Sequence, residues 1–307
     1  MSTIRGEANR APHRLRHAAA AAVLALLASC SSGEPAEDAP PRQPEDAVRQ
    51  LVGDLRRGDP AAYARHAVPA ELHARLETAW REGRTLWPLT ELPLHGQLPG
   101  FLATMAQPDA DKALLTQYRR QFAGAHAELR SAATTLGLFA TRYVAASPDY
   151  SPDERAHYVR LIGALSAWGQ RAPLGDPARA REAIPQLVAG ARLTGLRDPA
   201  RFRRDGMAAT LARLRPFAVR FKQVLAAHYG LDLDAALDSV QTQLLEQDGD
   251  HARVRVRYRL AGQAIEGTVR VERRDGRWYL SDLLRHAEAE ASRPHPGSVA
   301  TGTAVAR

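Results

Sequence analysis

The chain has 307 residues, of which 45% are hydrophobic and 25% are charged. This composition is typical of a folded globular protein and excludes a chain that is disordered throughout. The formal net charge is +8, and Cys30 is the only cysteine, which excludes a scaffold held together by disulfides. The positive charge is spread along the chain without a basic and aromatic binding module, so no nucleic-acid partner is expected.

The N-terminal residues have the pattern of a secretory signal. Residues 1–17 contain four arginines and one glutamate, and an apolar run from Ala18 to Ala28 follows directly. The run is too short for a transmembrane helix, which needs about 20 apolar residues. It ends in Leu27-Ala28-Ser29-Cys30, which resembles the lipobox of bacterial lipoproteins.

The lipobox resemblance implies a location for the protein. Residues 1–29 would be a lipoprotein signal peptide, and Cys30 would be the acylated N-terminus, carrying chains such as palmitate. Several acyl chains give a stable membrane anchor. Because Ser31 follows the cysteine instead of aspartate, similarity to enteric lipoproteins implies the periplasmic face of the outer membrane. The alternative is an ordinary signal peptide with a chance cysteine near its end.

Residues 30–44 are rich in serine, proline, glycine and acidic residues and have no apolar period. This composition predicts a disordered tether between the membrane and the folded part. From residue 45 to residue 230, apolar residues recur at helical spacing and predict a largely helical region. Its first helices are expected at about 44–57, 60–66 and 69–84.

Residues 85–101 contain three prolines and two glycines among apolar residues, so an irregular segment is expected there. Its apolar side chains form a candidate docking loop, or else an irregular segment that packs over the core. They are Leu86, Trp87, Leu89, Leu92 and Leu94.

A long helix is predicted over about 111–145, because one apolar stripe keeps the helical period across it. The stripe consists of Leu115, Tyr118, Phe122, Leu129, Leu136, Phe139 and Tyr143. Three further helices are predicted to begin at Ser151-Pro152, Asp176-Pro177 and Asp198-Pro199, where a capping residue precedes a proline. The last of them is expected to kink or break near Pro216.

After Gly230 the apolar period changes from helical to two, which indicates strands. Strands are expected at about 239–246, 251–260, 263–274 and 277–282, with glycine-containing turns between them. The sequence therefore predicts an α+β fold, with a mostly helical body followed by a four-stranded antiparallel meander packed on helices over residues 231–290. Residues from His286 onward lose the pattern, and residues 291–307 are expected to be a disordered tail.

Two segments resemble exported NTF2-like (cystatin-like) proteins. They are residues 45–67, with the sequence GDPAAYARH, and residues 239–285, with the sequence VRVERRDGRWYLSDLL. The resemblance implies a curved antiparallel sheet that wraps helices into a cone with a pocket. The chain departs from that pattern by the long helical stretch between the two segments, which would be a large insertion. The alternative is a helical bundle with an unrelated sheet.

The second predicted strand has a basic face. Val254, Val256, Tyr258 and Leu260 alternate with Arg253, Arg255, Arg257 and Arg259, so one face is apolar and the other carries four arginines. This arginine row is a candidate binding stripe for an anionic ligand or partner. The alternative is a solvated sheet face on which Glu246, Glu266 and Glu272 neutralise the arginines.

The sequence contains no catalytic motif, and neither a cofactor nor a metal site is expected. His73 and Glu77 have helical spacing, with His66 near them, but an exposed pair explains them better than a metal site. His157 is assigned to a charge cluster in the first turn of its helix. Asp149, Asp153 and Glu154 would serve a hydrolase only if two of them converged in a cleft.

Together these features predict a non-enzymatic, lipid-anchored envelope protein. It would bind another envelope protein, for example by capturing an incoming toxin as an immunity-type lipoprotein, or an anionic envelope component. The alternative is a small-ligand carrier with an NTF2-like pocket. A hydrolase that acts on cell-wall material is the third hypothesis.

Overall fold

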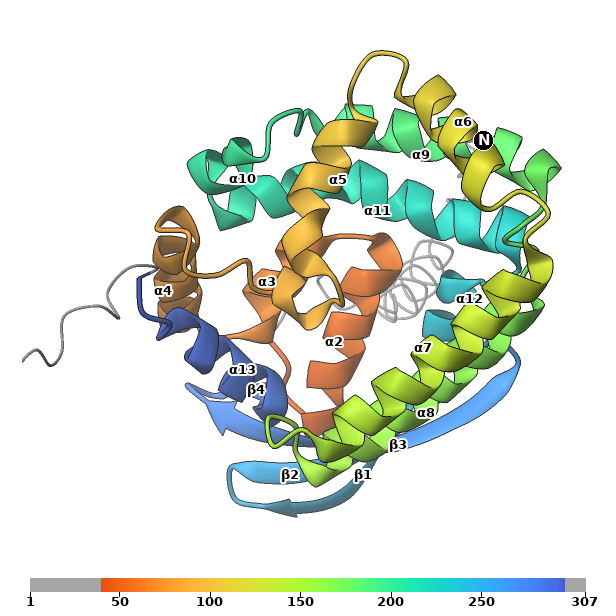
Figure 1. Ribbon diagram of the computed structural model, residues 1–307. Coiled ribbons are helices and arrows are strands. Elements are labelled where there is room, and N and C mark those ends of the chain that lie inside the picture. Colours follow the sequence, from red (N-terminus) through yellow and green to blue (C-terminus); the bar gives the residue numbers. More distant parts are fainter. Residues whose placement is uncertain (1–39, 296–307) are drawn as a thin grey trace, which may run out of the picture. The chain divides into compact units, whose positions relative to one another are not determined.

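The computed structural model describes residues 40–295, and Figure 1 shows how their helices and strands are arranged. The signal peptide at 1–29, Cys30, most of the tether and the end of the C-terminal tail lie outside the described residues. From Pro41 onward the described chain forms one compact unit, so its helices and strands share their contacts.

Helices make up most of residues 40–239. They are α2 (Pro44–Arg57), α3 (Pro60–Ala67), α4 (Ala70–Arg81), η1 (Leu89–Glu91), η2 (His95–Gln97), α5 (Leu98–Met105), α6 (Ala110–Gln121), α7 (His126–Ala146), α8 (Pro152–Arg171), α9 (Pro177–Thr194), α10 (Ala200–Asp205), α11 (Met207–Tyr229) and α12 (Leu233–Asp238).

The capping residues begin the helices where the sequence predicts. Asp59 accepts a hydrogen bond from the Ala62 amide at the start of α3. Ser151 and Glu154 form a reciprocal capping box at the start of α8, with proline at the first helical position. Asp176 accepts a hydrogen bond from the Ala178 amide at the start of α9. These local signals therefore fix the helix starts in this part of the fold.

The prediction of a single helix over residues 111–145 is wrong. The chain instead forms α6 and α7, because Gly124 between them has a left-handed backbone with φ of +78°. Of the kink or break expected near Pro216, the break does not occur, since α11 continues through this residue. The chain breaks at Gly206, where φ is +81° and a Cβ would overlap the side chains of Glu77 and Arg81.

Four antiparallel strands form a sheet with the order β1-β2-β3-β4. They are β1 (Gln241–Asp248), β2 (His251–Leu260), β3 (Gln263–Arg274) and β4 (Arg277–Leu280). The prediction that the chain frays from His286 onward is wrong, because the helix α13 (Ser281–Ala291) follows β4 directly. This helix buries Leu284, Ala287 and Ala291, which have the spacing of one helical face.

The inner face of the sheet packs against α2, which contacts all four strands. Ala47 and Val48 of α2 are buried there against the apolar face of the sheet, which consists of Ala252, Val254, Val256, Val271 and Trp278. The two segments that resemble NTF2-like proteins therefore lie against each other. The α+β architecture, a mostly helical body followed by an open antiparallel sheet, is confirmed.

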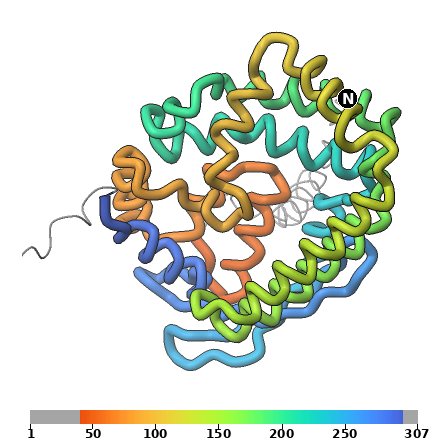
Figure 2. The backbone as a smooth tube through the Cα atoms, viewed as in Figure 1, coloured from red at the N-terminus to blue at the C-terminus, as the bar shows by residue number. Residues whose placement is uncertain are grey.

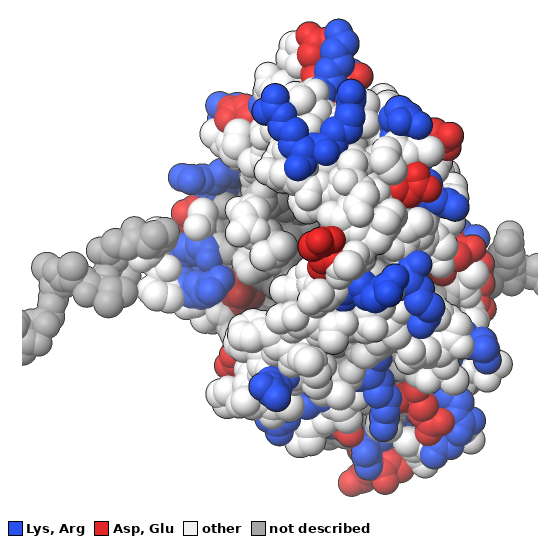
Figure 3. Space-filling model, turned by 45° about the vertical axis from the view of Figure 1, so that its right-hand side comes forward, with Lys and Arg blue, Asp and Glu red and all other residues white. Residues whose placement is uncertain are grey.

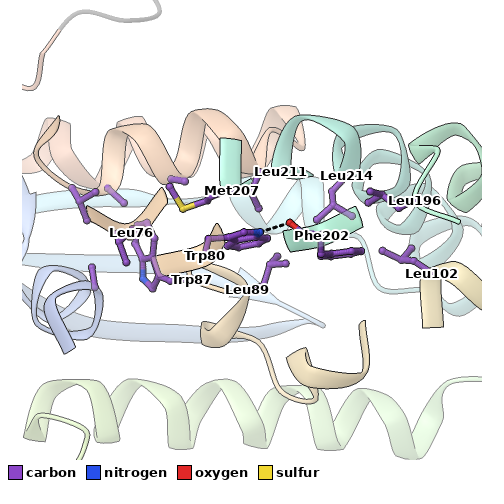
Figure 4. Close-up of a cluster of buried hydrophobic side chains, with 14 of the residues drawn as sticks. Leu76, Trp80, Trp87, Leu89, Leu102, Leu196, Phe202, Met207, Leu211 and Leu214 are labelled. Carbon is purple, nitrogen blue, oxygen red and sulfur yellow. Dashed lines mark hydrogen bonds between the residues drawn. The ribbon is translucent and has the colours of Figure 1, made fainter. Parts of the chain in front are cut away.

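The larger core lies between the helices. Trp80 of α4 is fully buried, and its indole nitrogen donates a hydrogen bond to the Phe202 carbonyl of α10 (Figure 4). Leu76, Met207 and Leu211 surround it in the same cluster. Helix α8 runs beside β3, and α7 runs beside α8 (Figure 2). Helices and sheet are thus joined through α2, α8 and α13.

Candidate functional site

The arginine row lies on the outer face of the sheet, opposite the apolar face that packs on α2. Arg253, Arg255, Arg257 and Arg259 alternate along β2 with buried or half-buried side chains. On the neighbouring strand, Arg270 lies directly opposite Arg253, and Glu266 lies directly opposite Arg257. Arg270 pairs with Asp282 of α13 at 2.8 Å, so a carboxylate compensates the second arginine at this end of the row.

Carboxylates neutralise the row only in part. Glu266 is shared by Arg255 at 3.3 Å and Arg257 at 2.6 Å, and its pKa is lowered chiefly by the Arg257 hydrogen bond. Arg253 reaches Glu246 at 3.3 Å and Asp153 at 3.8 Å.

The Arg259 guanidinium, at the other end of the row, bonds only the Gly262 carbonyl at 3.3 Å and, within residues 40–295, reaches no carboxylate. Of the three expected partners, Glu246 and Glu266 contact the row. Glu272 instead pairs with Arg274 on its own strand. The solvated-face interpretation therefore accounts for Arg253, Arg255 and Arg257 better than for Arg259.

Shallow hollows lie at both ends of the row. One, of about 470 Å³, is lined by Arg257, Arg259 and Glu266. The other, of about 570 Å³, is lined by Arg253 and Arg270, together with acidic residues. These hollows are open depressions of mixed charge on the surface. They fit a protein surface better than an enclosed small molecule.

The candidate docking loop divides into a buried and an exposed part. Trp87 is fully buried, Leu89 is 6% exposed, and both belong to the helical core, with Leu86 packed against it. Leu92 and Leu94 are 52% and 74% exposed. The first part of the segment therefore packs over the core, and Leu92 and Leu94 are the most exposed of the five residues.

Two of the candidates from the sequence, Glu77 and His157, make contacts that hold the fold together. Glu77 accepts a hydrogen bond from the Ala208 amide and pairs with Arg81, so it connects α4 to the start of α11. The assignment of His157 to a first-turn charge cluster is wrong. Its ring packs on Gly267 of the sheet and lies 3.3 Å from the Tyr258 hydroxyl, and burial lowers its pKa.

One polar cluster was not predicted from the sequence. His286 of α13 lies between two carboxylates, with Nδ1 3.1 Å from Glu91 and Nε2 3.5 Å from Glu154. Arg285 pairs with Glu154 at 2.5 Å, and the Tyr150 ring lies edge-on to the imidazole. Each carboxylate is already engaged by the protein, so the cluster joins η1, α8 and α13 instead of forming an open reactive site.

This cluster predicts a pH dependence of stability. The hydrogen bond that the His286 ring donates to Glu91 is the main cause that raises the pKa of His286, while burial is the main cause that raises the pKa of Glu154. A histidine with a raised folded pKa stabilises the fold fully below its unfolded pKa of about 6.5, and this contribution is lost as the pH rises through the folded pKa.

We expect His286→Gln to lower the free energy of unfolding by about 1–2 kcal/mol at a pH of about 6, and by less at a pH of about 8.5. Urea unfolding at both pH values measures the difference. His286 also lowers the pKa of Glu154 electrostatically, so the difference between wild type and variant reports the His286–Glu154 pair together. An equal loss at both pH values would contradict the prediction.

Within residues 40–295, no helix is long and apolar enough to cross a membrane. The same residues contain no group of three or more histidine, cysteine, aspartate or glutamate side chains placed to hold a metal ion. No protein-family model, curated protein or solved structure matches the chain.

Proposed function

We propose that this chain is a lipid-anchored envelope lipoprotein that binds an acidic partner protein through the arginine row. The anchor rests on the lipobox Leu27-Ala28-Ser29-Cys30, and the folded unit would be presented from the outer membrane into the periplasm. An incoming toxin with an acidic surface, captured by an immunity-type lipoprotein, is one partner of this kind.

One observation supports the binding role most strongly. Arg259 lies exposed at one end of the row, and its guanidinium reaches no carboxylate within residues 40–295. Beside it, Arg255 and Arg257 share the single carboxylate of Glu266. This part of the sheet face therefore carries more positive than negative charge. An acidic partner would supply the carboxylate that Arg259 lacks and bind it through charge-assisted hydrogen bonds.

The carrier alternative has less support. An NTF2-like carrier would hold its ligand between the sheet and its helices. Here that space is filled by α2, whose Ala47 and Val48 pack on Val254 and Trp278. The hydrolase hypothesis has less support too, because Asp153 pairs with Arg253, and Glu154 is engaged by Arg285 and His286.

The test compares two charge reversals of equal size. Arg253→Glu with Arg259→Glu changes both ends of the row. The control, Arg119→Glu with Arg120→Glu, changes two exposed arginines of α6 that pair with no carboxylate in the described part of the chain. The probe is a labelled polyglutamate chain, and its affinity is measured by fluorescence anisotropy over a range of salt concentrations. We expect the row variant to bind at least about tenfold more weakly at low salt, and the control to change by less than about twofold.

Equal losses in the two variants would contradict the proposal, because then only net charge would matter. Anionic phosphatidylglycerol vesicles are the second probe. If the row were needed for vesicle binding and not for polyglutamate binding, the ligand would be an anionic envelope surface and the acidic-protein proposal would fail.

A further inference from the structure

Helix α7 has an unusual environment for a helix of 21 residues. Among the elements of residues 40–295, it packs closely along only one neighbour, α8. On that side the two helices approach closely: the Ser166 hydroxyl donates to the Ala133 carbonyl, and a Cβ at Gly137 would overlap Ser166. Figure 1 shows α7 in front of α8, and Figure 3 shows a broad surface with few charged groups in the middle of the turned view.

The other sides of α7 expose large apolar side chains. Leu136, Phe139 and Tyr143 are 66%, 69% and 58% exposed. With Leu129 and Ala132 they form a stripe whose members are separated alternately by three and four residues, which is the spacing of a helix–helix seam. We call these five residues the α7 stripe. An exposed apolar seam of this kind marks an interaction surface.

The charges beside the α7 stripe are self-complementary. Glu128 and Arg142 lie on the same flank of the stripe, on the side that α8 leaves open, and each is seven residues from Thr135. Both side chains are exposed, and neither forms an ion pair with another described residue. If a second α7 runs antiparallel across a two-fold axis near Thr135, each Glu128 lies opposite the partner's Arg142.

The same arrangement matches the sizes of the side chains. Leu129 would lie against the partner's Phe139, and the small Ala132 would leave room for the partner's Leu136 close to the axis. A parallel pair would leave Glu128 and Arg142 without these contacts. A two-fold axis also makes the interface isologous, so it closes at a dimer.

We propose that the α7 stripe is a homodimer interface, in which α7 of one copy packs antiparallel against α7 of a second copy with reciprocal Glu128–Arg142 ion pairs. A helix of this length buries less surface than stable complexes do, so the dissociation constant in solution is on the order of 10–100 µM. Attachment of both copies to one membrane would raise their effective concentration. The inference does not depend on the ligand of the arginine row.

The experiment uses the full chain with Cys30→Ala, which removes the only cysteine, and measures mass by analytical ultracentrifugation over a concentration series. Phe139→Gln is expected to weaken dimerisation at least about tenfold. Leu138→Gln is the matched control, because Leu138 lies on the same helix, is 59% exposed and is outside the α7 stripe. It should change the dissociation constant by less than about twofold.

Charge exchange tests the orientation. Glu128→Arg and Arg142→Glu should each weaken the dimer, and the double variant should restore it, because the ion pairs re-form with exchanged signs. Thr135→Cys should form an intermolecular disulfide under mild oxidation, and Leu138→Cys should not. A chain that stays monomeric at all concentrations, or a dimer that Phe139→Gln and the charge reversals leave unchanged, would overturn the proposal.

Discussion

Replacement of Asp54 by alanine is expected to lower the free energy of unfolding by about 2–3 kcal/mol, the upper part of the usual cost of leaving a buried polar group without its hydrogen-bond partner. The Asp54 side chain is fully buried at the end of α2. One oxygen lies 2.6 Å from the Arg57 guanidinium, and the other lies 2.9 Å from Nδ1 of His66 in α3. Without the carboxylate, the His66 ring would stay buried and lose this hydrogen bond, which is the physical reason for the large effect.

Urea unfolding measures this loss of free energy, with an unchanged m-value showing that the folded state stays compact. Asp54→Asn keeps the shape of the side chain and should cost less than alanine. Arg49→Ala is the surface control on the same helix, because its pair with Asp46 is half-exposed and is expected to contribute less than about 1 kcal/mol. If Asp54→Ala cost no more than Arg49→Ala, the buried network would have no role in joining α2 to α3.

The helix starts and the strands could be predicted because their signals are local. Asp59, Ser151 and Asp176 each cap a helix through a hydrogen bond to a residue two or three positions later. The alternation along β2 likewise predicts which side chains are buried, since successive side chains of a strand point to opposite faces. The arginine row is thus the part of the candidate site that a sequence pattern can place.

The α7 stripe shows what a helical sequence pattern cannot predict. Leu136 and Phe139 have the helical period of a buried face, but a period does not specify whether another helix covers that face. In this fold α8 packs on the side of Ala133 and Gly137 instead. Within a single copy the α7 stripe is therefore exposed. The sequence pattern predicts that a surface packs against it but does not specify which one.

The Glu91–Glu154–His286 cluster could not be predicted for a different reason. Its three residues come from η1, α8 and α13, and they meet only because those elements pack together. No spacing rule connects residues 91, 154 and 286, and isolated histidines and glutamates are common in any helical sequence. Such clusters depend on tertiary packing and are visible only once the fold is known.

Replacement of Cys30 by alanine is expected to abolish membrane attachment. If Leu27-Ala28-Ser29-Cys30 is a lipobox, Cys30 is the single site of acylation in a chain with no other cysteine. One acyl chain gives only marginal binding and several give stable anchoring, so a chain without any should leave the membrane fraction completely. Fractionation of cells measures membrane attachment, and labelling with a palmitate analogue measures acylation.

Ser31→Asp is the matched control, because it keeps the cysteine and should remain labelled and membrane-bound while moving toward the inner membrane. Membrane retention of an unlabelled Cys30→Ala chain would contradict the lipoprotein assignment and place the anchor elsewhere in the chain.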